Sequence, residues 1–96
     1  MQLGVIQSFA DKDTQALYTG KPIQRFSAFV AIAERKLAQL NNARSIRDLG
    51  AIPGNRLEAL RGARRGEYSI RINDQFRIVF CWRGEGPSDV RIEDYH

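Results

Sequence analysis

Two runs of alternating residues between positions 68 and 82 constrain the fold of this chain more than any other feature. In residues 68–72 and again in residues 76–82, apolar side chains occupy every second position. These positions are Tyr68, Ile70, Ile72, Phe76, Ile78, Phe80 and Trp82. Because successive side chains of a strand point to opposite faces, the pattern predicts two half-buried strands. The polar break at residues 73–75 predicts that the strands pair as antiparallel neighbours.

The positions between the apolar residues carry arginine. We expect Arg71 and Arg77 to lie on the open face of the sheet, opposite the apolar side chains. Arg77→Ala is then expected to leave the protein folded, because a change at a surface position alters stability by only about 0.5 kcal/mol. Cys81 lies in the same strand pattern, and we expect it to be a core residue.

A helical pattern precedes the two strands. In residues 25–40 the apolar side chains recur at spacings of three and four, at Phe26, Phe29, Val30, Ala33, Leu37 and Leu40. This spacing predicts an amphipathic helix of about four turns that starts near residue 23 and packs on the apolar face of the sheet. We predict one core that contains Phe29, Val30, Leu37, Ile70, Ile78 and Phe80.

Weaker patterns complete the predicted fold. Residues 2–9 predict a short opening strand, and a short helix follows that is capped by Asp11 or Asp13 and stopped by Gly20. Residues 57–61 and 89–95 predict two further strands. A chain of 96 residues has room for one core. We therefore expect a single α+β domain over residues 1–96, with an N-terminal strand and two helices packed on one face of a mainly antiparallel β-sheet.

The composition excludes several classes of site. The chain has one cysteine and one histidine, which excludes an internal disulfide, a zinc site of His and Cys ligands, and a two-histidine ribonuclease mechanism. We expect no metal and no cofactor. The N-terminus lacks the pattern of a signal peptide, and no apolar run approaches the roughly 18 residues of a membrane span. We expect a soluble, cytoplasmic protein without membrane contact.

The charge pattern favours nucleic acid as a partner. The formal net charge is +4, and arginine outnumbers lysine by twelve to three. The guanidinium group of arginine binds phosphate through paired hydrogen bonds, whereas a charge that only keeps a protein soluble does not need this geometry. Nucleic acid is therefore the leading partner class, and an ordinary charged surface is the alternative.

The last three residues are the remaining candidates for chemistry. Asp94 could accept a proton or orient a partner, Tyr95 could stack on a base, and His96 could transfer a proton near neutral pH. With Arg61 and Arg77 neutralising the phosphate, this set is sufficient for attack of a ribose 2′-hydroxyl on the adjacent phosphate of RNA, without a metal. The alternative is that the residues form only a polar chain end.

Four segments together resemble one protein family. They are RKLAQLNNA at 35–43, RDLGAIPGNRLEAL at 47–60, the run SIRIN-x-Q-aromatic-R at 69–77, and the terminal Asp94-Tyr95-His96. In order and spacing these segments resemble the HigB-type toxins of the RelE superfamily, in the plasmid-maintenance or host-inhibition-of-growth branch.

The resemblance implies a ribosome-dependent mRNA endoribonuclease that inhibits translation and is neutralised by a HigA-type antitoxin, with operator DNA bound only through the antitoxin complex. It implies a catalytic set of Arg61, Arg77, Asp94, Tyr95 and His96. It also implies RNA and ribosome contacts at Arg35, Lys36, Arg56, Arg64, Arg65, Arg71 and Asn73. Arginine cannot act as a base at neutral pH, so Arg61 is expected to stabilise charge only. The alternative is a non-catalytic RNA- or DNA-binding module that uses the same basic face.

Overall fold

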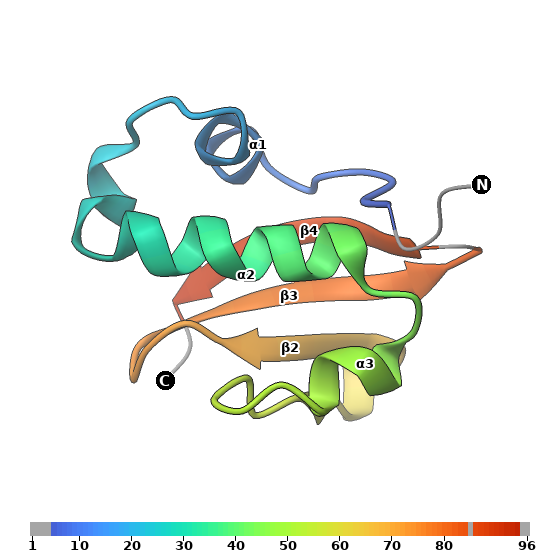
Figure 1. The fold of residues 1–96 in the computed structure, drawn as a ribbon. Coiled ribbons are helices and arrows are strands. Elements are labelled where there is room, and N and C mark those ends of the chain that lie inside the picture. The colour runs from blue at the N-terminus through green and yellow to red at the C-terminus, as the bar shows by residue number, and fades with distance from the viewer. Residues whose placement is uncertain (1–4, 85, 95–96) are drawn as a thin grey trace.

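The α-helices and the first 3-10 helix lie on one face of an antiparallel sheet in the computed structural model, which describes residues 5–84 and 86–94 (Figure 1). The helical elements are α1 (Lys12–Tyr18), the 3-10 helix η1 (Gln24–Phe29), α2 (Val30–Asn42), α3 (Ile46–Gly50) and the 3-10 helix η2 (Gly62–Arg64). The strands are β1 (Glu58–Ala59), β2 (Glu67–Arg71), β3 (Phe76–Arg83) and β4 (Gly86–Asp94). The predicted α+β class is confirmed.

The strands follow one another across the sheet in chain order, and each is antiparallel to its neighbour. Ile70 pairs with Ile78 and Arg71 with Arg77, which confirms the predicted pairing of the two alternating runs. The turn between β2 and β3 is built by Asn73, whose Oδ1 accepts the backbone N–H groups of Gln75 at 2.9 Å and Phe76 at 2.8 Å. An Asn side chain that bonds forward to its own backbone in this way stabilises a tight turn.

The predicted opening strand is wrong over the residues that the structure describes. Residues 5–9 contain a parallel bridge between Phe9 and Val90 in place of a strand, and residues 2–4 lie outside the described residues. Two backbone hydrogen bonds surround the bridge, from Ala10 N to Val90 O at 2.9 Å and from Val90 N to Ser8 O at 3.1 Å. The pairing stops there because Asp11 caps α1 directly afterwards, accepting the N–H of Thr14 at 2.6 Å.

The predicted second helix is divided in two. Its first part is the 3-10 helix η1, and α2 begins only at Val30, after Phe29 has left the helical path with φ −139° and ψ 27°. A 3-10 helix places residues three apart on one side, so both Phe26 and Phe29 reach the core, where their ring centroids lie 5.7 Å apart. The amphipathic pattern therefore identified the buried face, although it did not identify the change of helix type.

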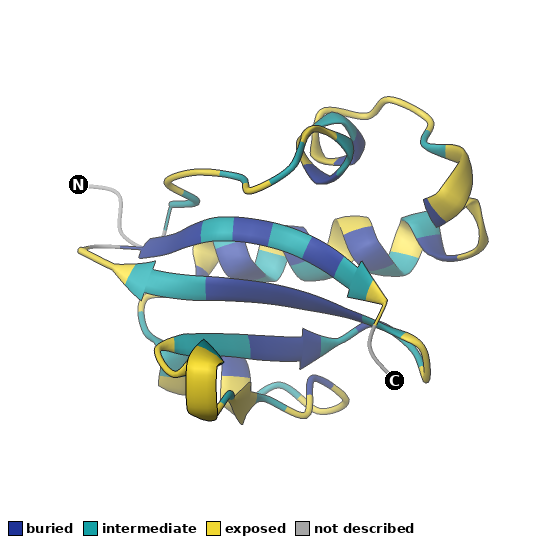
Figure 2. Cartoon of the chain, turned by 180° about the vertical axis from the view of Figure 1, so that it is seen from behind, coloured by how far each residue is buried: buried dark blue, intermediate teal, exposed yellow. Residues whose placement is uncertain are grey.

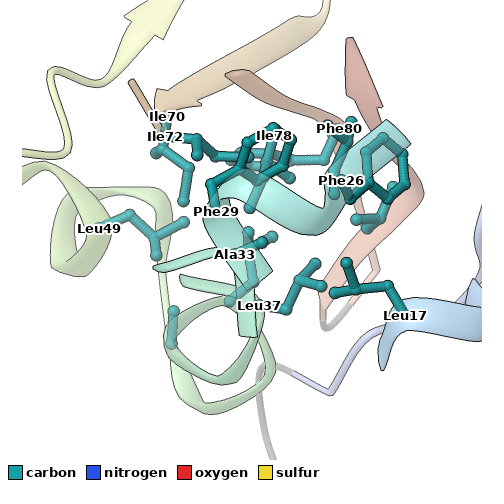
Figure 3. Close-up of a cluster of buried hydrophobic side chains, with 14 residues drawn as sticks. Leu17, Phe26, Phe29, Ala33, Leu37, Leu49, Ile70, Ile72, Ile78 and Phe80 are labelled. Atoms are coloured by element: carbon teal, nitrogen blue, oxygen red, sulfur yellow. The ribbon is translucent and has the colours of Figure 1, made fainter. Parts of the chain in front are cut away.

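The core lies between α2, η1 and the inner face of the sheet (Figure 3). Five of the six predicted core residues are confirmed as buried members of one cluster: Phe29, Leu37, Ile70, Ile78 and Phe80. The prediction was wrong for Val30, which is only half-buried because it is the first residue of α2 after the break at Phe29.

Cys81 also differs from its prediction. It is half-buried with a free thiol, and it does not belong to the core cluster. It follows Phe80, which points into the core, so the alternation of β3 directs Cys81 to the outer face of the sheet. Within the described residues, none of the helices is long and apolar enough to cross a membrane.

Candidate functional site

The residues in the middle of β3 are buried, including Arg77 and Val79 of the outer face, although the α-helices lie on the other side of the sheet (Figure 2). This face carries Arg71 and Arg77 on adjacent strands as direct neighbours, so their predicted side of the sheet is confirmed. Because like charges that face each other across strands destabilise a sheet, the surrounding groups must offset the repulsion. Those groups define the candidate site.

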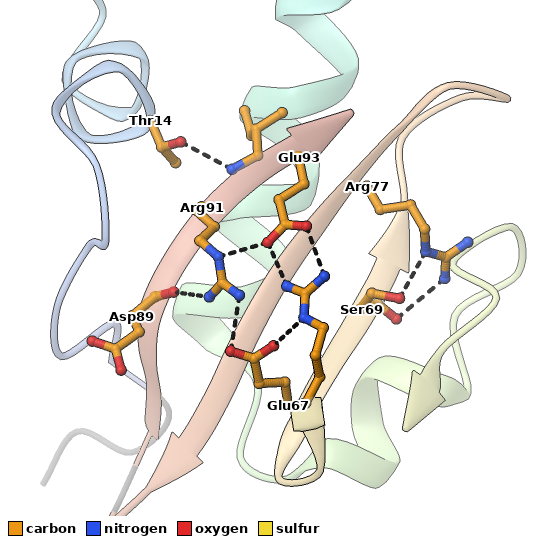
Figure 4. A network of polar contacts seen from close by, with 9 residues as sticks. Thr14, Glu67, Ser69, Arg77, Asp89, Arg91 and Glu93 are labelled. Carbon is orange, nitrogen blue, oxygen red and sulfur yellow. Dashed lines mark hydrogen bonds and ion pairs between the residues drawn. The ribbon is translucent and has the colours of Figure 1, made fainter. Parts of the chain in front are cut away.

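Arg77 is buried, which contradicts the expectation of an exposed side chain; its exposed fraction is 8%. Its Nε donates to Ser69 Oγ at 2.7 Å, and its Nη2 donates to the carbonyl oxygen of Ser69 at 3.3 Å (Figure 4). The same Nη2 donates to the carbonyl oxygen of Arg56 at 2.5 Å. The carboxylate of Glu58 lies 3.5 Å from the same Nη2. The guanidinium group is buried because the segment from Arg56 to Glu58 runs along the edge of β2 and covers it.

The backbone of Arg56 is shaped for this contact. Its φ of +45° lies in the left-handed region, which residues other than glycine adopt at a cost. The conformation directs the carbonyl oxygen of Arg56 to the guanidinium group of Arg77. The unfavourable backbone conformation of Arg56 therefore helps to fix the position of the Arg77 guanidinium group.

Arg71 is half-buried and forms an ion pair with Asp74 in the β2–β3 turn. Asp94, the last residue of β4, pairs with Phe76 across the sheet, and its Oδ2 accepts a hydrogen bond from Gln75 Nε2 at 3.0 Å. The start of β3, the end of β2 and the end of β4 thus lie at one end of the sheet (Figure 1). This brings Asp94 to the same end of the sheet as Arg71 and Arg77, although its pairing with Phe76 places it on the opposite face from the two arginines.

Tyr95 and His96 lie outside the described residues, so their predicted roles stay predictions.

A closed ring of ion pairs covers the rest of the outer face (Figure 4). Arg64 contacts Glu67 at 2.8 Å and Glu93 at 2.5 Å, and Arg91 contacts Glu67 at 2.8 Å and Glu93 at 2.7 Å. Beneath the ring lies Val79, which pairs with Arg91 in β4 and is 0% exposed. The ring explains why an apolar residue on the outer face is fully buried.

The ring also changes the electrostatics of this face. Burial alone would raise the pKa of both Glu67 and Glu93, but the hydrogen bonds from Arg64 and Arg91 outweigh it and hold each pKa below its ordinary value. The hydrogen bond to Glu93 raises the pKa of Arg64. Arg64 was predicted to bind RNA, yet its charge is already neutralised by two carboxylates.

Arg61 is not brought together with Arg77 and Asp94. It follows Leu60, whose N–H donates to Glu67 O, so it lies beyond the end of β2 opposite to Arg71. At about 3.3 Å per residue, the two ends of β2 are roughly 13 Å apart. Arg61 is exposed at that far end.

The other predicted RNA contacts are distributed over several elements. Arg35, Arg56 and Arg65 are exposed, and Arg35 lines a shallow hollow between α2 and α3. Lys36 is half-buried, and its Nζ donates to Asn55 Oδ1 at 2.5 Å. Burial, followed by the positive charges of Arg35, Arg71 and Arg77, lowers the pKa of Lys36.

A family model for "RelE-like toxin of type II toxin-antitoxin system HigB" matches residues 7–96. The chain belongs to the HigB-like toxin family.

Two relatives match this HigB-like toxin over shorter stretches. Toxin HigB-1 of Vibrio cholerae serotype O1 is 48% identical over 48 residues, which are 50% of each chain. An uncharacterized protein of Haemophilus influenzae is 28% identical over 64 residues, covering 67% of this chain and 63% of that protein. The matched region thus spans about half to two thirds of the length of these relatives.

A solved structure supports the fold of the HigB-like toxin. A YoeB/ParE toxin from Agrobacterium tumefaciens aligns with a TM-score of 0.52 over 96% of this chain and 98% of that one, at 20% sequence identity. At that identity, the likeness concerns the fold alone.

The sequence did not indicate three residues that hold side chains of the candidate site in the HigB-like toxin: Asn55, Glu58 and Ser69. Ser69 and Glu58 hold Arg77, and Asn55 holds Lys36. Ser69 had a usable signal, because it lies on the same strand face as Arg71. The only signal for Asn55 is its position after Pro53-Gly54, which indicates a turn but does not identify a hydrogen-bond partner.

Within residues 5–84 and 86–94, no group of three His, Cys, Asp or Glu side chains is placed to hold a metal ion.

Proposed function

We propose that this HigB-like toxin is a ribosome-dependent mRNA endoribonuclease that inhibits translation. One observation supports the proposal: Asp94 and Arg77 lie at the same end of the sheet, and Ser69 and Arg56 hold the guanidinium group of Arg77 through hydrogen bonds. Cleavage of RNA by its own 2′-hydroxyl needs a fixed positive charge near the phosphate and groups that orient or move protons. The end of β4 leads directly into such groups, Tyr95 and His96.

In the proposed reaction Arg77 stabilises the charge that develops on the phosphate oxygens. Its hydrogen bonds to Ser69 and Arg56 hold the guanidinium group in place before substrate arrives, so little reorganisation is needed as charge forms. Asp94 orients a neighbouring group or accepts the proton of the 2′-hydroxyl, Tyr95 stacks on a base, and His96 donates a proton to the departing 5′-oxygen. These steps need no metal.

Arg61 is proposed to contact the RNA away from the bond that is cleaved. Its place beyond the far end of β2 suits a flanking phosphate of an extended strand. The exposed Arg35, Arg56 and Arg65 are proposed to contact ribosomal RNA or the message, with Arg71 beside Arg77. Asn73 and Arg64 are proposed to act mainly by shaping the turn and the outer face, since their polar groups bond within the protein.

The family also supports a partner. We infer that a HigA-type antitoxin binds the toxin and neutralises it, that operator DNA is contacted only through that complex, and that the toxin acts in the cytoplasm, where ribosomes are found. The family model, which matches residues 7–96, supports the antitoxin.

A second candidate function is a non-catalytic RNA- or DNA-binding module. It is favoured by the burial of Arg77, whose guanidinium group already bonds to Ser69 and Arg56. Induction of the chain alone in growing bacteria separates the two candidates. Growth arrest with a fall in translation supports the nuclease, and unchanged growth supports the binding module.

Primer extension on a message bound to purified ribosomes tests the proposal directly. The protein should produce defined breaks within the translated region, and these should disappear when the antitoxin is added. Free message incubated with the same amount of protein shows whether the ribosome is required. Identical extension products with and without the protein would refute the proposed activity.

A further inference from the structure

Two consecutive residues, Asn55 and Arg56, connect the helices to the arginines of the sheet. The side chain of Asn55 is fully buried, and its Nδ2 donates to Gln39 Oε1 at 3.1 Å and to Leu49 O at 3.0 Å. Its Oδ1 accepts from Lys36 Nζ at 2.5 Å. The side chain is thus tied to both α2 and α3.

The backbone of the same pair is tied to the sheet. The carbonyl oxygen of Asn55 accepts the N–H of Arg71 at 2.7 Å, beyond the point where β1 begins. The carbonyl oxygen of Arg56 accepts from the guanidinium group of Arg77. A movement of Asn55 would therefore change the positions of Lys36, Arg71 and Arg77 relative to one another.

The lysine that Asn55 holds has no counter-charge in the described part of the chain. Within residues 5–84 and 86–94, Lys36 forms no ion pair, and Asn55 is the one hydrogen-bond partner of its ammonium group. An ammonium group has further N–H donors to offer. The charged groups that act on Lys36 are Arg35 of α2, Arg71 of β2 and Arg77 of β3, all of them positive. Asp74 pairs with Arg71 and Glu58 with Arg77, so among the three cations of this site Lys36 is the one without a carboxylate in the described part of the chain.

Like charges held together at a half-buried position lower the stability of a fold. Such positions often bind a ligand of opposite charge. Asn55 is neutral, so it fixes Lys36 without cancelling its charge. A carboxylate at position 55 would have made an ion pair and removed the attraction for an anion.

We propose that Asn55 is a positioning residue that couples Lys36 of α2 to Arg71 and Arg77 of the sheet, so that these three cations receive one phosphate group of an RNA strand. The inference rests on the proposed function for the identity of the ligand as RNA. It assigns Lys36 to the phosphate site of Arg77 and not to a general ribosome-contacting surface. It also assigns a positioning role to Asn55, which takes no part in the reaction itself.

The lowered pKa of Lys36 gives the proposal a readout of its own. Phosphate binds the protonated amine, so RNA affinity should fall as the pH rises through the pKa of Lys36. Arginine at position 36 would keep the charge and remain protonated in that range. Lys36→Arg should therefore bind RNA without this pH dependence.

The test measures binding of a short single-stranded RNA whose 2′-hydroxyls are methylated, so that it cannot be cleaved. Fluorescence anisotropy gives the affinity across a series of pH values and salt concentrations. Lys36→Gln, which keeps an amide N–H for Asn55, should bind at least about fivefold more weakly. Its slope of log affinity against log salt should be shallower by about 0.7, the value for one phosphate contact to a single strand. Lys12→Gln removes an exposed lysine of α1 and is the matched control, expected to bind like the wild type.

Asn55→Ala tests the positioning role. It retains all three cations, yet it should weaken RNA binding and change the pH dependence of binding, because Lys36 is no longer held at its half-buried position beside Arg71 and Arg77. If this variant does not fold, the Lys36 variants still decide the matter. Wild-type affinity and salt slope in Lys36→Gln, or wild-type affinity and pH dependence of RNA binding in folded Asn55→Ala, would overturn the inference.

The outcomes separate this inference from the proposed function. A protein that binds the methylated RNA through Lys36 but leaves ribosome-bound message intact would refute the nuclease and support the phosphate site. A protein that cuts the message, with Lys36→Gln cutting and binding as well as wild type, would refute the phosphate site and support the nuclease.

Discussion

Replacing Arg77 with alanine should destabilise the protein as well as inactivate it. The guanidinium group of Arg77 bonds to Ser69 Oγ at 2.7 Å and to Arg56 O at 2.5 Å, and Ser69 is 0% exposed. Hydrogen bonds to a charged group contribute about 1.5–3 kcal/mol each, and water entering the space vacated by the side chain recovers part of that. We expect a loss of about 2–4 kcal/mol in the free energy of unfolding.

The expected loss for Arg77→Ala is a large share of the protein's total free energy of unfolding. A chain of this length has an expected stability of about 5–14 kcal/mol. The melting temperature of such a domain falls by about 4–8 °C for each kcal/mol lost. The Arg77→Ala variant should therefore remain folded near room temperature but melt well below the wild type.

Urea denaturation followed by the fluorescence of Trp82, the chain's one tryptophan, measures the effect, since this residue packs against the core. Arg65→Ala is the matched control, because Arg65 is exposed, and its effect should stay within about 0.5 kcal/mol. An unfolding free energy for Arg77→Ala within that same range would refute the reasoning from burial.

Toxicity of Arg77→Ala has to be measured at a temperature where the variant is folded. Loss of one preorganised charge costs about 3–4 kcal/mol of transition-state stabilisation, or roughly a hundredfold to a thousandfold in rate. Near-wild-type cleavage by the folded variant would refute the catalytic role.

Three further predictions concern other parts of the chain. Glu67 and Glu93 have folded-state pKa values below the unfolded value of about 4.3, so their contribution to the stability of the protein is present above that pH and is lost as the pH falls through the folded pKa. The urea concentration at the unfolding midpoint should therefore drop in acid. The double variant Glu67→Gln, Glu93→Gln should show a smaller change of this midpoint with pH. Deleting His96 should abolish cleavage of ribosome-bound message with little change in melting temperature, whereas wild-type rates would reject its role. Gly20→Ala should lower the unfolding free energy by about 1 kcal/mol, because φ is +93° there although a Cβ would meet no atom within 4 Å; calorimetry that shows no loss would contradict the strain argument.

The alternating runs predicted the centre of the sheet well. The pairing of Ile70 with Ile78 and the shared core of Phe29 and Leu37 follow from the two periods of strand and helix. The ends of elements were predicted less well, because they depend on local competition. The opening strand ends where Asp11 caps α1, and the second helix changes type at Phe29.

The sequence predicted some residues of the candidate site, but it did not predict their burial or their interaction partners. The strand period correctly placed Arg71 and Arg77 on one face, yet it could not show that Arg77 is buried or that Arg64 is neutralised by Glu93. Arg64 and Glu93 are far apart in the chain, and only the packing of η2 over the sheet brings them together.

By itself, the sequence determined which side chains share a face, because alternation along a strand and the helical repeat are properties of the local backbone. It also determined the excess of arginine and the family to which the chain belongs. Only the tertiary structure decided which cations are neutralised and which keep their charge. That depends on groups distant in sequence, such as Asn55 beside Lys36 and Glu58 beside Arg77, whose interactions with these cations fall steeply with distance and with exposure to water.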